Sequence, residues 1–221
     1  MAPFGKIYTY PENFRVLRVQ LAAALNGLEV SVVEDFKMGE TNKTPEFLAK
    51  FPLGKVPALE CADGFCVWES AAIARYVAQS GPLADQLIGA DAKTQALIHQ
   101  WSCFAEGEIV SNVIPPFGMA VLKFMPADQA RFDSCITNLE RALKAVDTAL
   151  AGGKKFLVGD KVTLADIMIA GSLYLPFKLF VDPEMRKGLP NLVSYVQSFS
   201  EDVTTKKVYG DLVLCDTRVA L

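Results

Sequence analysis

The dipeptide Glu69-Ser70 stands where a short apolar run gives way to a helix, and its setting can bind a small anion. The apolar run Phe65–Trp68 precedes it, and the segment AAIARYVA follows with apolar residues at helical spacing. A serine at such a junction can cap the helix, and the exposed N–H groups of a helix N-terminus favour an anion. The sequence therefore predicts a site for a small carboxylate ligand at this junction.

The elements that must position this dipeptide form a β-hairpin and a β-α-β unit. Two β-prone runs, Val56–Glu60 and Phe65–Trp68, flank Ala62-Asp63-Gly64, and Asp-Gly between such runs predicts a hairpin. Earlier in the chain, the pattern predicts a strand over residues 6–10 and a second strand over residues 29–34. The helix between them begins after Asn13 as N-cap and ends at Gly27. With a short helix after Thr44, the order β-α-β-α-β-β-α indicates a thioredoxin-like domain with a small mixed sheet.

The composition changes over residues 79–90, after which strand signals almost vanish. Helices are predicted over 91–113, 127–150, 164–180 and 190–199, with Pro115-Pro116 and Gly152-Gly153 interrupting them. The fold class is therefore α/β plus all-α, with an α/β domain over 1–80, a linker over 81–90 and an all-helical domain over 91–221. Thr163 and Asp166 have the spacing of a capping box, which is a structural signal rather than a chemical one.

Composition and charge exclude several classes of function. A formal net charge of -3 argues against direct binding of nucleic acid, which requires a basic surface. The sequence shows no signal peptide and no apolar run long enough to span a membrane. A single histidine, His99, argues against zinc sites and other metal centres. The five scattered cysteines are expected to be reduced thiols, mostly in the core of a cytoplasmic protein.

Three motifs in order resemble the cytosolic glutathione transferase superfamily. They are Lys55-Val56-Pro57-Ala58, then Glu69 to Ile73, then Leu157-Val158-Gly159 with Thr163 to Asp166. The resemblance covers nearly the whole chain. It implies that the helical part is a glutathione transferase C-terminal domain and that glutathione is the ligand or co-substrate.

Within that superfamily, several segments are similar to the transferase-like N-terminal region of elongation factor 1 gamma subunits. These segments are Tyr8 to Asn13, Thr41 to Leu48, Lys50-Phe51-Pro52, Asp63 to Val67, and Val208 to Cys215. Gamma subunits continue through a charged linker into a second domain, whereas this sequence ends at Leu221. The resemblance therefore leaves two alternatives, the N-terminal part of such a subunit or a free-standing transferase of the same lineage.

The resemblance implies roles for five residues in binding glutathione. Val56 would precede a cis-proline, Pro57, and its backbone would pair with the cysteinyl part of the ligand as an added strand does. Glu69 would take the γ-glutamyl ammonium group, while Ser70 and the helix N-terminus would take the carboxylate. Lys55 would pair with the glycyl carboxylate, with a solvated surface lysine as the alternative interpretation.

The same resemblance requires a group that favours the thiolate of glutathione, because a free thiol has a pKa of about 8.5. Other members use Tyr, Ser or Cys near the end of the first strand, and this chain has neither Ser nor Cys before Asn26. The candidates are Tyr8, Asn13 and Arg15, with Thr9 and Tyr10 beside them. Tyr8 and Tyr10 share one face of the strand, so both also fit ordinary packing roles.

The resemblance also predicts a small hydrophobic electrophile held between the domains, and partners of two kinds. We expect a two-fold homodimer, and possible contacts with other subunits of the elongation factor 1 exchange complex. The electrophile would lie against the first helix of the second domain. The residues at helical spacing there, which fit a core equally well, are Trp101, Phe104, Ile109, Val113 and Phe117.

Overall fold

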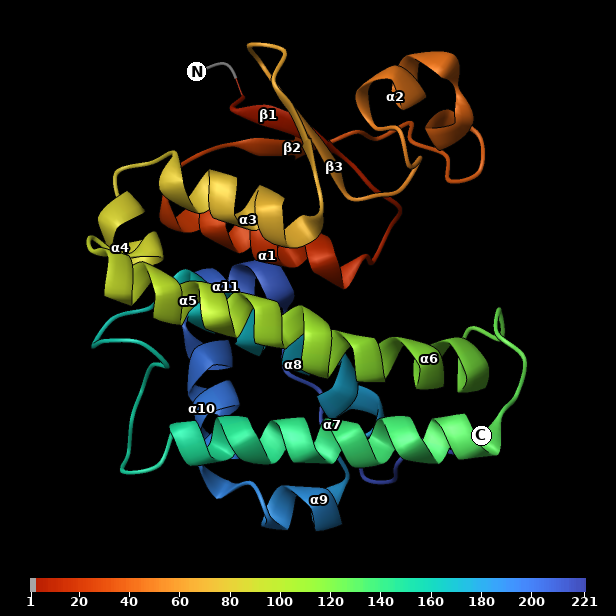
Figure 1. Ribbon diagram of the computed structural model, residues 1–221, viewed down its shortest axis with the longest axis vertical. Helices are drawn as coiled ribbons and strands as arrows, with labels where there is room; N and C mark the ends of the chain where they lie inside the picture. The colour runs from red at the N-terminus through yellow and green to blue at the C-terminus, as the bar shows by residue number, and fades with distance from the viewer. Residues whose placement is uncertain (1–2) are drawn as a thin grey trace.

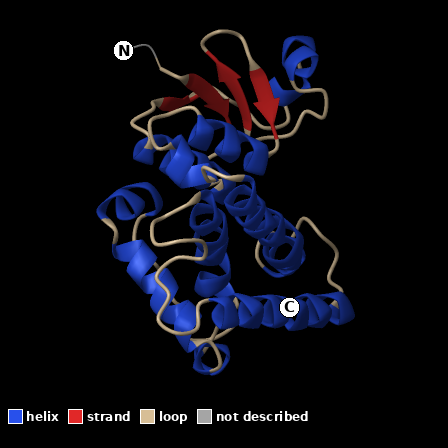
Figure 2. Cartoon of the chain, turned by 60° about the vertical axis from the view of Figure 1, so that its left-hand side comes forward, coloured by secondary structure: helices blue, strands red, loops and turns tan. Residues whose placement is uncertain are grey.

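In the computed structural model, which describes residues 3–221, four short strands form one mixed sheet in the order β2-β1-β3-β4 (Figure 2). β1 runs parallel to β2 and antiparallel to β3, and β3 pairs with β4 as the predicted hairpin. This sheet confirms the thioredoxin-like arrangement. The strands are β1 (Gly5–Tyr8), β2 (Val30–Val32), β3 (Ala58–Cys61) and β4 (Cys66–Trp68).

Two helices cover one face of this sheet and separate it from the helical domain. α1 (Phe14–Leu25) packs against α3 (Ser70–Gln79) and against α8 of the second domain (Figure 1). α1 begins where predicted, because the Asn13 side chain accepts a hydrogen bond from the Arg15 N–H at 3.2 Å. A 3-10 turn (Thr41–Lys43) and α2 (Pro45–Lys50) lie away from α1 and α3.

The second half of the chain is entirely helical among the described residues, as predicted. α7 and α8 match the predicted 127–150 and 164–180, whereas α4 occupies part of the predicted linker 81–90. The helices are α4 (Ala84–Ile88), α5 (Ala92–Phe104), the π-helical turn η2 (Ala105–Val110), α6 (Ser111–Ala120), α7 (Gln129–Ala149), α8 (Leu164–Leu179), α9 (Pro183–Lys187), α10 (Pro190–Glu201) and α11 (Val203–Tyr209).

The expectation that Pro115-Pro116 interrupts the helices is wrong. α5, η2 and α6 form one continuous helical rod through both prolines (Figure 1). Pro removes a backbone donor and usually breaks a helix, but tertiary packing can override this cost. Here both proline rings are buried against the rest of the domain, which holds the helical path beyond them.

The predicted capping box at the start of α8 is confirmed. The Asp166 carboxylate accepts hydrogen bonds from the Thr163 N–H at 2.9 Å, the Leu157 N–H at 2.9 Å and the Tyr195 hydroxyl at 2.9 Å. Burial raises the pKa of this carboxyl, and the hydrogen bonds oppose that rise. Asp166 therefore ties α8 to the preceding loop and to α10.

Within residues 3–221, no helix is long and apolar enough to cross a membrane. Over the same residues, no three side chains of metal-binding type come together as a cluster.

Candidate functional site

The loop before β3 presents an unpaired stretch of backbone. The Val56–Pro57 peptide bond is cis, as the resemblance implies, and the ladder between β3 and β4 begins only at Ala58. In the described chain the Val56 N–H and C=O form no backbone hydrogen bond. An extended ligand can therefore pair with Val56 in the manner of an added strand.

The Glu69-Ser70 junction differs in detail from the predicted cap. Glu69, not Ser70, occupies the N-cap position of α3, and no side chain among residues 3–221 caps this helix. Ser70 is the first helical residue and is buried. The first N–H groups of a helix have no intrahelical acceptor, and here Ile73 donates the first intrahelical bond, to the Glu69 carbonyl at 2.9 Å. The uncapped helix start therefore leaves donors available for an anion.

Glu69 also has an unusual backbone conformation. Its φ of 69° lies in the left-handed region that L-residues with a side chain rarely adopt. Such strain costs on the order of 1–3 kcal/mol and clusters at ligand-binding positions. The conformation leaves the Glu69 side chain exposed beside the uncapped helix start. A cationic group can thus meet Glu69 while an anionic group meets the α3 N-terminus.

Asn13 and Arg15 lie at the start of α1. The buried Asn13 amide donates one hydrogen bond to the Thr9 hydroxyl at 3.1 Å, which leaves its second amide hydrogen without a partner among residues 3–221. Burial lowers the pKa of the Arg15 guanidinium, and the negative charges of Glu106 and Glu69 act in the opposite direction. The charge of Glu69 thus acts on Arg15 across a long separation in the sequence.

Tyr8 is held by a different set of residues. Its hydroxyl donates a 2.7 Å hydrogen bond to the Glu60 carboxylate, which also accepts one from the Lys50 ammonium at 2.7 Å. Burial and the bond to Glu60 raise the pKa of Tyr8 to about 12. Its ring packs edge-on against Phe47 and Phe51. The Tyr8 hydroxyl proton is thus already hydrogen-bonded to the Glu60 carboxylate.

The remaining predicted residues lie in two kinds of environment. Lys55 is exposed and pairs with no acidic side chain in the described part of the chain. Ile109 and Val113 belong to the core, whereas Trp101, Phe104 and Phe117 are partly buried and pack on it. The core interpretation of these apolar residues therefore holds for Ile109 and Val113.

Two charged residues beside this site were not predicted from the sequence. The fully buried Arg18 forms an ion pair with Glu106 on the π-helical turn, and donates a 2.8 Å hydrogen bond to the Ser172 hydroxyl. This pair joins α1 to the second domain. The only local signal was the position of Arg18 between apolar residues of α1, because its partners are 88 and 154 residues away.

Comparison with known protein families shows how this chain is related to other proteins. The family described as "Glutathione S-transferase, N-terminal domain" matches residues 3–79, and "Glutathione S-transferase, C-terminal domain" matches residues 107–202. The chain belongs to the glutathione S-transferase family.

Relatives of this transferase family fall into two groups. "Glutathione S-transferase-like protein LUC7" of a Fusarium species is 44% identical over 222 residues, covering 99% of this chain and 98% of that protein. Mouse elongation factor 1-gamma is 37% identical over 218 residues, covering 96% of this chain. The chain spans only 48% of the length of that elongation factor.

Solved structures of an elongation factor 1-gamma domain and of a glutathione S-transferase share the fold. The GST-like domain of yeast elongation factor 1-gamma superimposes with a TM-score of 0.80 at 22% identity, covering 100% of this chain and 99% of that one. A theta class glutathione S-transferase from Xanthomonas axonopodis pv. citri, solved with glutathione bound, gives a TM-score of 0.79 at 24% identity and covers 97% of this chain and 100% of that one. These structures establish the two-domain transferase fold.

Proposed function

We propose that this protein binds glutathione at the corner formed by Val56 and Glu69 and conjugates it, through its sulfur atom, to small apolar electrophiles. The observation that carries the proposal is the combination of unpaired Val56 backbone, exposed Glu69 and the uncapped N-terminus of α3. Together they match a peptide with an extended backbone and an amino-acid end that bears both charges. A full-length relative with a transferase-like name at 44% identity supports the same activity.

Each binding residue has a role in this proposal. The Val56 N–H and C=O pair with the cysteinyl residue beside the cis Pro57, and Glu69 binds the γ-glutamyl ammonium group. Ser70 and the N-terminus of α3 bind the γ-glutamyl carboxylate. Exposed Lys55 pairs with the glycyl carboxylate.

We assign to Asn13 the hydrogen bond that stabilises the thiolate sulfur of glutathione. Its free amide hydrogen can donate to the thiolate, and the positive charge of Arg15 favours the ionised form. The thiol proton passes to solvent, the thiolate attacks the electrophilic carbon, and a leaving group departs with the electron pair of its bond. Tyr8 is the second candidate, but it would have to release Glu60 to donate to sulfur.

Calorimetry with reduced glutathione tests the binding step. We expect an affinity between micromolar and millimolar, and a loss of at least tenfold in Ser70→Ala. Ser80→Ala, at the opposite end of α3, is the matched control and should bind normally. Absence of heat at millimolar glutathione would refute the proposal, and turnover of a chloro-nitroaromatic substrate tests the transfer step.

A scaffold role in an elongation factor complex is the second candidate. It is supported by the 37% identity to mouse elongation factor 1-gamma over nearly the whole chain. Under this alternative, the purified chain should retain the exchange-factor subunit of the elongation factor 1 complex in a pull-down, and Ser70→Ala should retain it equally well. If the purified chain does not retain the exchange-factor subunit but keeps its transferase activity, the scaffold role is refuted and the enzymatic function stands.

We also infer a two-fold homodimer. Phe65 and Trp68 around β4 and Leu97 on α5 are 47%, 39% and 49% exposed, and we assign these apolar side chains to the interface between the two copies. Sedimentation equilibrium should give twice the chain mass, and Trp68→Glu should shift the protein towards monomer. A monomer at micromolar concentration would contradict this inference.

A further inference from the structure

A short series of hydrogen bonds holds the side chain of Asn13. The Asn13 Oδ1 accepts a hydrogen bond from the Arg15 N–H at 3.2 Å, and the Asn13 Nδ2 lies 3.1 Å from the Thr9 Oγ1. The Thr9 Oγ1 lies 3.1 Å from the Tyr10 carbonyl oxygen. Because Thr9 and Asn13 are both buried, their polar groups depend on these partners.

The direction of each bond follows from the groups at the two ends of this series. A backbone N–H can only donate, and a backbone carbonyl can only accept. The Arg15 N–H therefore requires the oxygen of the Asn13 amide, which leaves the amide nitrogen for Thr9. The Tyr10 carbonyl takes the hydroxyl hydrogen of Thr9. The Thr9 oxygen must consequently accept its bond from the Asn13 nitrogen.

This arrangement fixes the second hydrogen of the Asn13 amide. The amide group is planar, and two anchors hold its plane: the Arg15 N–H on the oxygen and the Thr9 hydroxyl on one hydrogen. The direction of the remaining hydrogen is therefore set as well. A donor held in place favours a thiolate over a thiol, because hydrogen bonds to a charged acceptor are the stronger ones.

A sharp bend in the chain brings Thr9 and Asn13 together. Pro11 and Glu12 form the turn between them, and Glu12 has a φ of 61°, in the left-handed region. Such strained residues cluster at functional sites. The turn closes on the bond between the Thr9 and Asn13 side chains, which are four residues apart in the sequence.

We propose that Thr9 is a positioning residue, which holds the Asn13 amide so that its free hydrogen points at the glutathione sulfur. This inference rests on the proposed function, because it takes Asn13 as the donor to the thiolate. Thr9 acts through Asn13 and does not touch the sulfur. Loss of the Thr9 hydroxyl keeps the cap of α1, since the bond from the Arg15 N–H remains, but it loosens the amide.

Kinetics of Thr9→Val and Thr9→Ser with glutathione and a chloro-nitroaromatic substrate test this role. Near neutral pH, Thr9→Val should lower kcat about fivefold with little change in KM for glutathione. The apparent pKa of the bound thiol should rise by about 0.7, which corresponds to that loss of thiolate. Above this pKa the two rates should converge, whereas a folding defect would lower the rate at every pH. Thr9→Ser, which keeps the hydroxyl, should behave as the native chain, and native kcat and thiol pKa in Thr9→Val would overturn the proposal.

The double variant Thr9→Val/Asn13→Ala separates positioning from an independent effect. Asn13→Ala alone should lower kcat at least tenfold. If Thr9 acts only through Asn13, adding Thr9→Val should lower kcat no further. Multiplication of the two losses, to about fiftyfold, would give Thr9 a role of its own and overturn the proposal.

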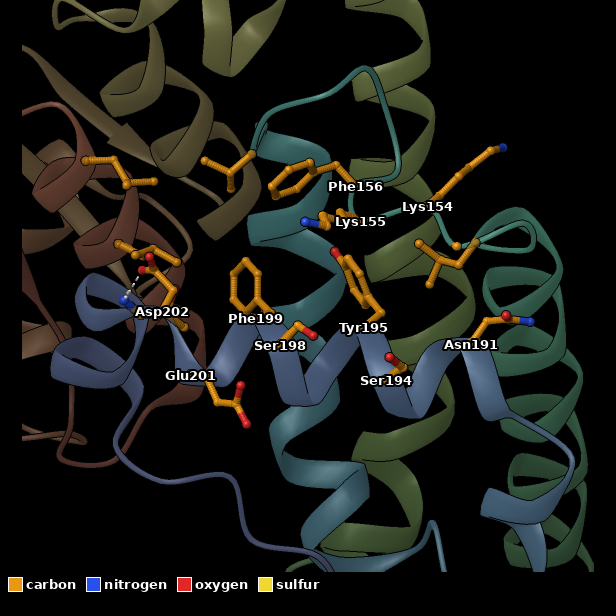
Figure 3. A pocket seen from close by; sticks show the side chains of 16 residues that line it. Lys154, Lys155, Phe156, Asn191, Ser194, Tyr195, Ser198, Phe199, Glu201 and Asp202 are labelled. Carbon is orange, nitrogen blue, oxygen red and sulfur yellow. Dashed lines mark hydrogen bonds between the residues drawn. The ribbon is translucent and has the colours of Figure 1, made fainter.

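The far end of α1 supplies a matched control. Leu25, the last residue of α1, lines a cavity of about 680 Å³ together with Phe199 of α10 (Figure 3). Thr205 lines the same cavity and, like Thr9, is buried. Because α1 is 12 residues long, about 18 Å of helix separates this end from Asn13. Thr205→Val should therefore keep the native kcat and thiol pKa, and a loss equal to that of Thr9→Val would overturn the proposal.

Nuclear magnetic resonance of the Asn13 side-chain amide in the native chain provides a test that needs no variant to fold. One Nδ2 hydrogen should exchange slowly with solvent before any ligand is added, because it is bound to Thr9. The second hydrogen should shift when reduced glutathione is added. Fast exchange of both hydrogens would overturn the proposal.

The outcomes distinguish this inference from the proposed function. Absence of glutathione binding by the native chain would refute both. Normal turnover by Asn13→Ala would overturn the donor assignment and the role of Thr9, but would leave glutathione binding standing. Normal kcat and thiol pKa in Thr9→Val, with a tenfold loss in Asn13→Ala, would refute the role of Thr9 alone.

Discussion

The Tyr8 hydroxyl and the Glu60 carboxylate are joined by a 2.7 Å hydrogen bond across the neighbouring strands β1 and β3. Lys6 lies directly opposite Glu60 in the register, and its ammonium group is 3.4 Å from the same carboxylate. Lys50 of α2 completes the set around Glu60 at 2.7 Å. This network holds Tyr8 in the packing of α2 on the sheet, which supports our proposal that Asn13 rather than Tyr8 serves the sulfur of a bound thiol.

Comparing Asn13→Ala with Tyr8→Phe tests which residue serves the sulfur. Asn13→Ala should lower kcat by at least tenfold, because the thiolate loses its hydrogen-bond donor. Tyr8→Phe should change kcat by less than threefold. Steady-state kinetics with a chloro-nitroaromatic substrate and the pH dependence of thiolate absorbance provide the measurements. A larger loss in Tyr8→Phe than in Asn13→Ala would reverse the assignment.

Glu60 should make stability depend on pH in the acid range. Burial by itself raises the pKa of the Glu60 carboxyl, but hydrogen bonds from Lys50 and Tyr8, with the charge of Lys6, lower it from 4.5 to about 2. The folded state therefore binds fewer protons than the unfolded state between these values, so this contribution is full above pH 4.5 and is lost as pH falls towards 2. Urea unfolding should show a shallower acid loss for Glu60→Gln than for the native chain.

A parallel acid series on Asp85→Asn, a residue in an exposed helix turn, is the control for that experiment. If Glu60→Gln and the native chain lose stability with the same slope from pH 5 to pH 2.5, roughly the window set by the two pKa values, the Glu60 network contributes nothing.

The Arg18–Glu106 pair should respond asymmetrically to mutation. Arg18 is fully buried, whereas the Glu106 side chain is 32% exposed. Glu106→Gln leaves a buried guanidinium without its counter-charge and should destabilise the fold by about 3 kcal/mol. Arg18→Met should cost less, since the remaining carboxylate can reach water. The double variant should recover part of the loss in urea unfolding, and a greater loss in Arg18→Met than in Glu106→Gln would contradict this explanation.

Gly171 on α8 should tolerate no side chain while Tyr209 is present. A Cβ at Gly171 would collide with the Tyr209 hydroxyl and lie 3.0 Å from the Arg18 Cγ. Gly171→Ala should therefore destabilise the protein by about 1–3 kcal/mol. Adding Tyr209→Phe removes the colliding oxygen and should restore part of the loss. The melting temperatures of the single and double variants measure this effect. If the double variant recovers no stability, the collision with the Tyr209 hydroxyl is not the cause of the loss.

Tyr209→Phe alone has its own expected result. The Tyr209 hydroxyl is buried and has no hydrogen-bond partner among residues 3–221. Its removal should be neutral or should stabilise the protein by about 1 kcal/mol, because an unsatisfied buried hydroxyl costs free energy. A clear loss of stability would indicate a partner for this hydroxyl that the fold alone does not supply.

The sequence by itself determined the features that depend on neighbours along the chain. Asn13 caps α1 and Thr163 with Asp166 caps α8, because capping joins residues within one helical turn. Alternation and the Asp63-Gly64 turn were enough to predict the hairpin of β3 and β4. The transferase fold itself followed from three short motifs.

Only the tertiary structure decided which side chains meet. Tyr8 contacts Glu60 through the register of β1 and β3, and Arg18 meets Glu106 through the packing of α1 on the rod of α5 and α6. Pro115 and Pro116 stay helical because distant packing outweighs their local cost. The same long-range packing places Glu69 at the N-cap of α3 with a positive φ, where its charge acts on Arg15 of α1. Candidate residues for the site could thus be named from the sequence, but the partners of these residues required the fold.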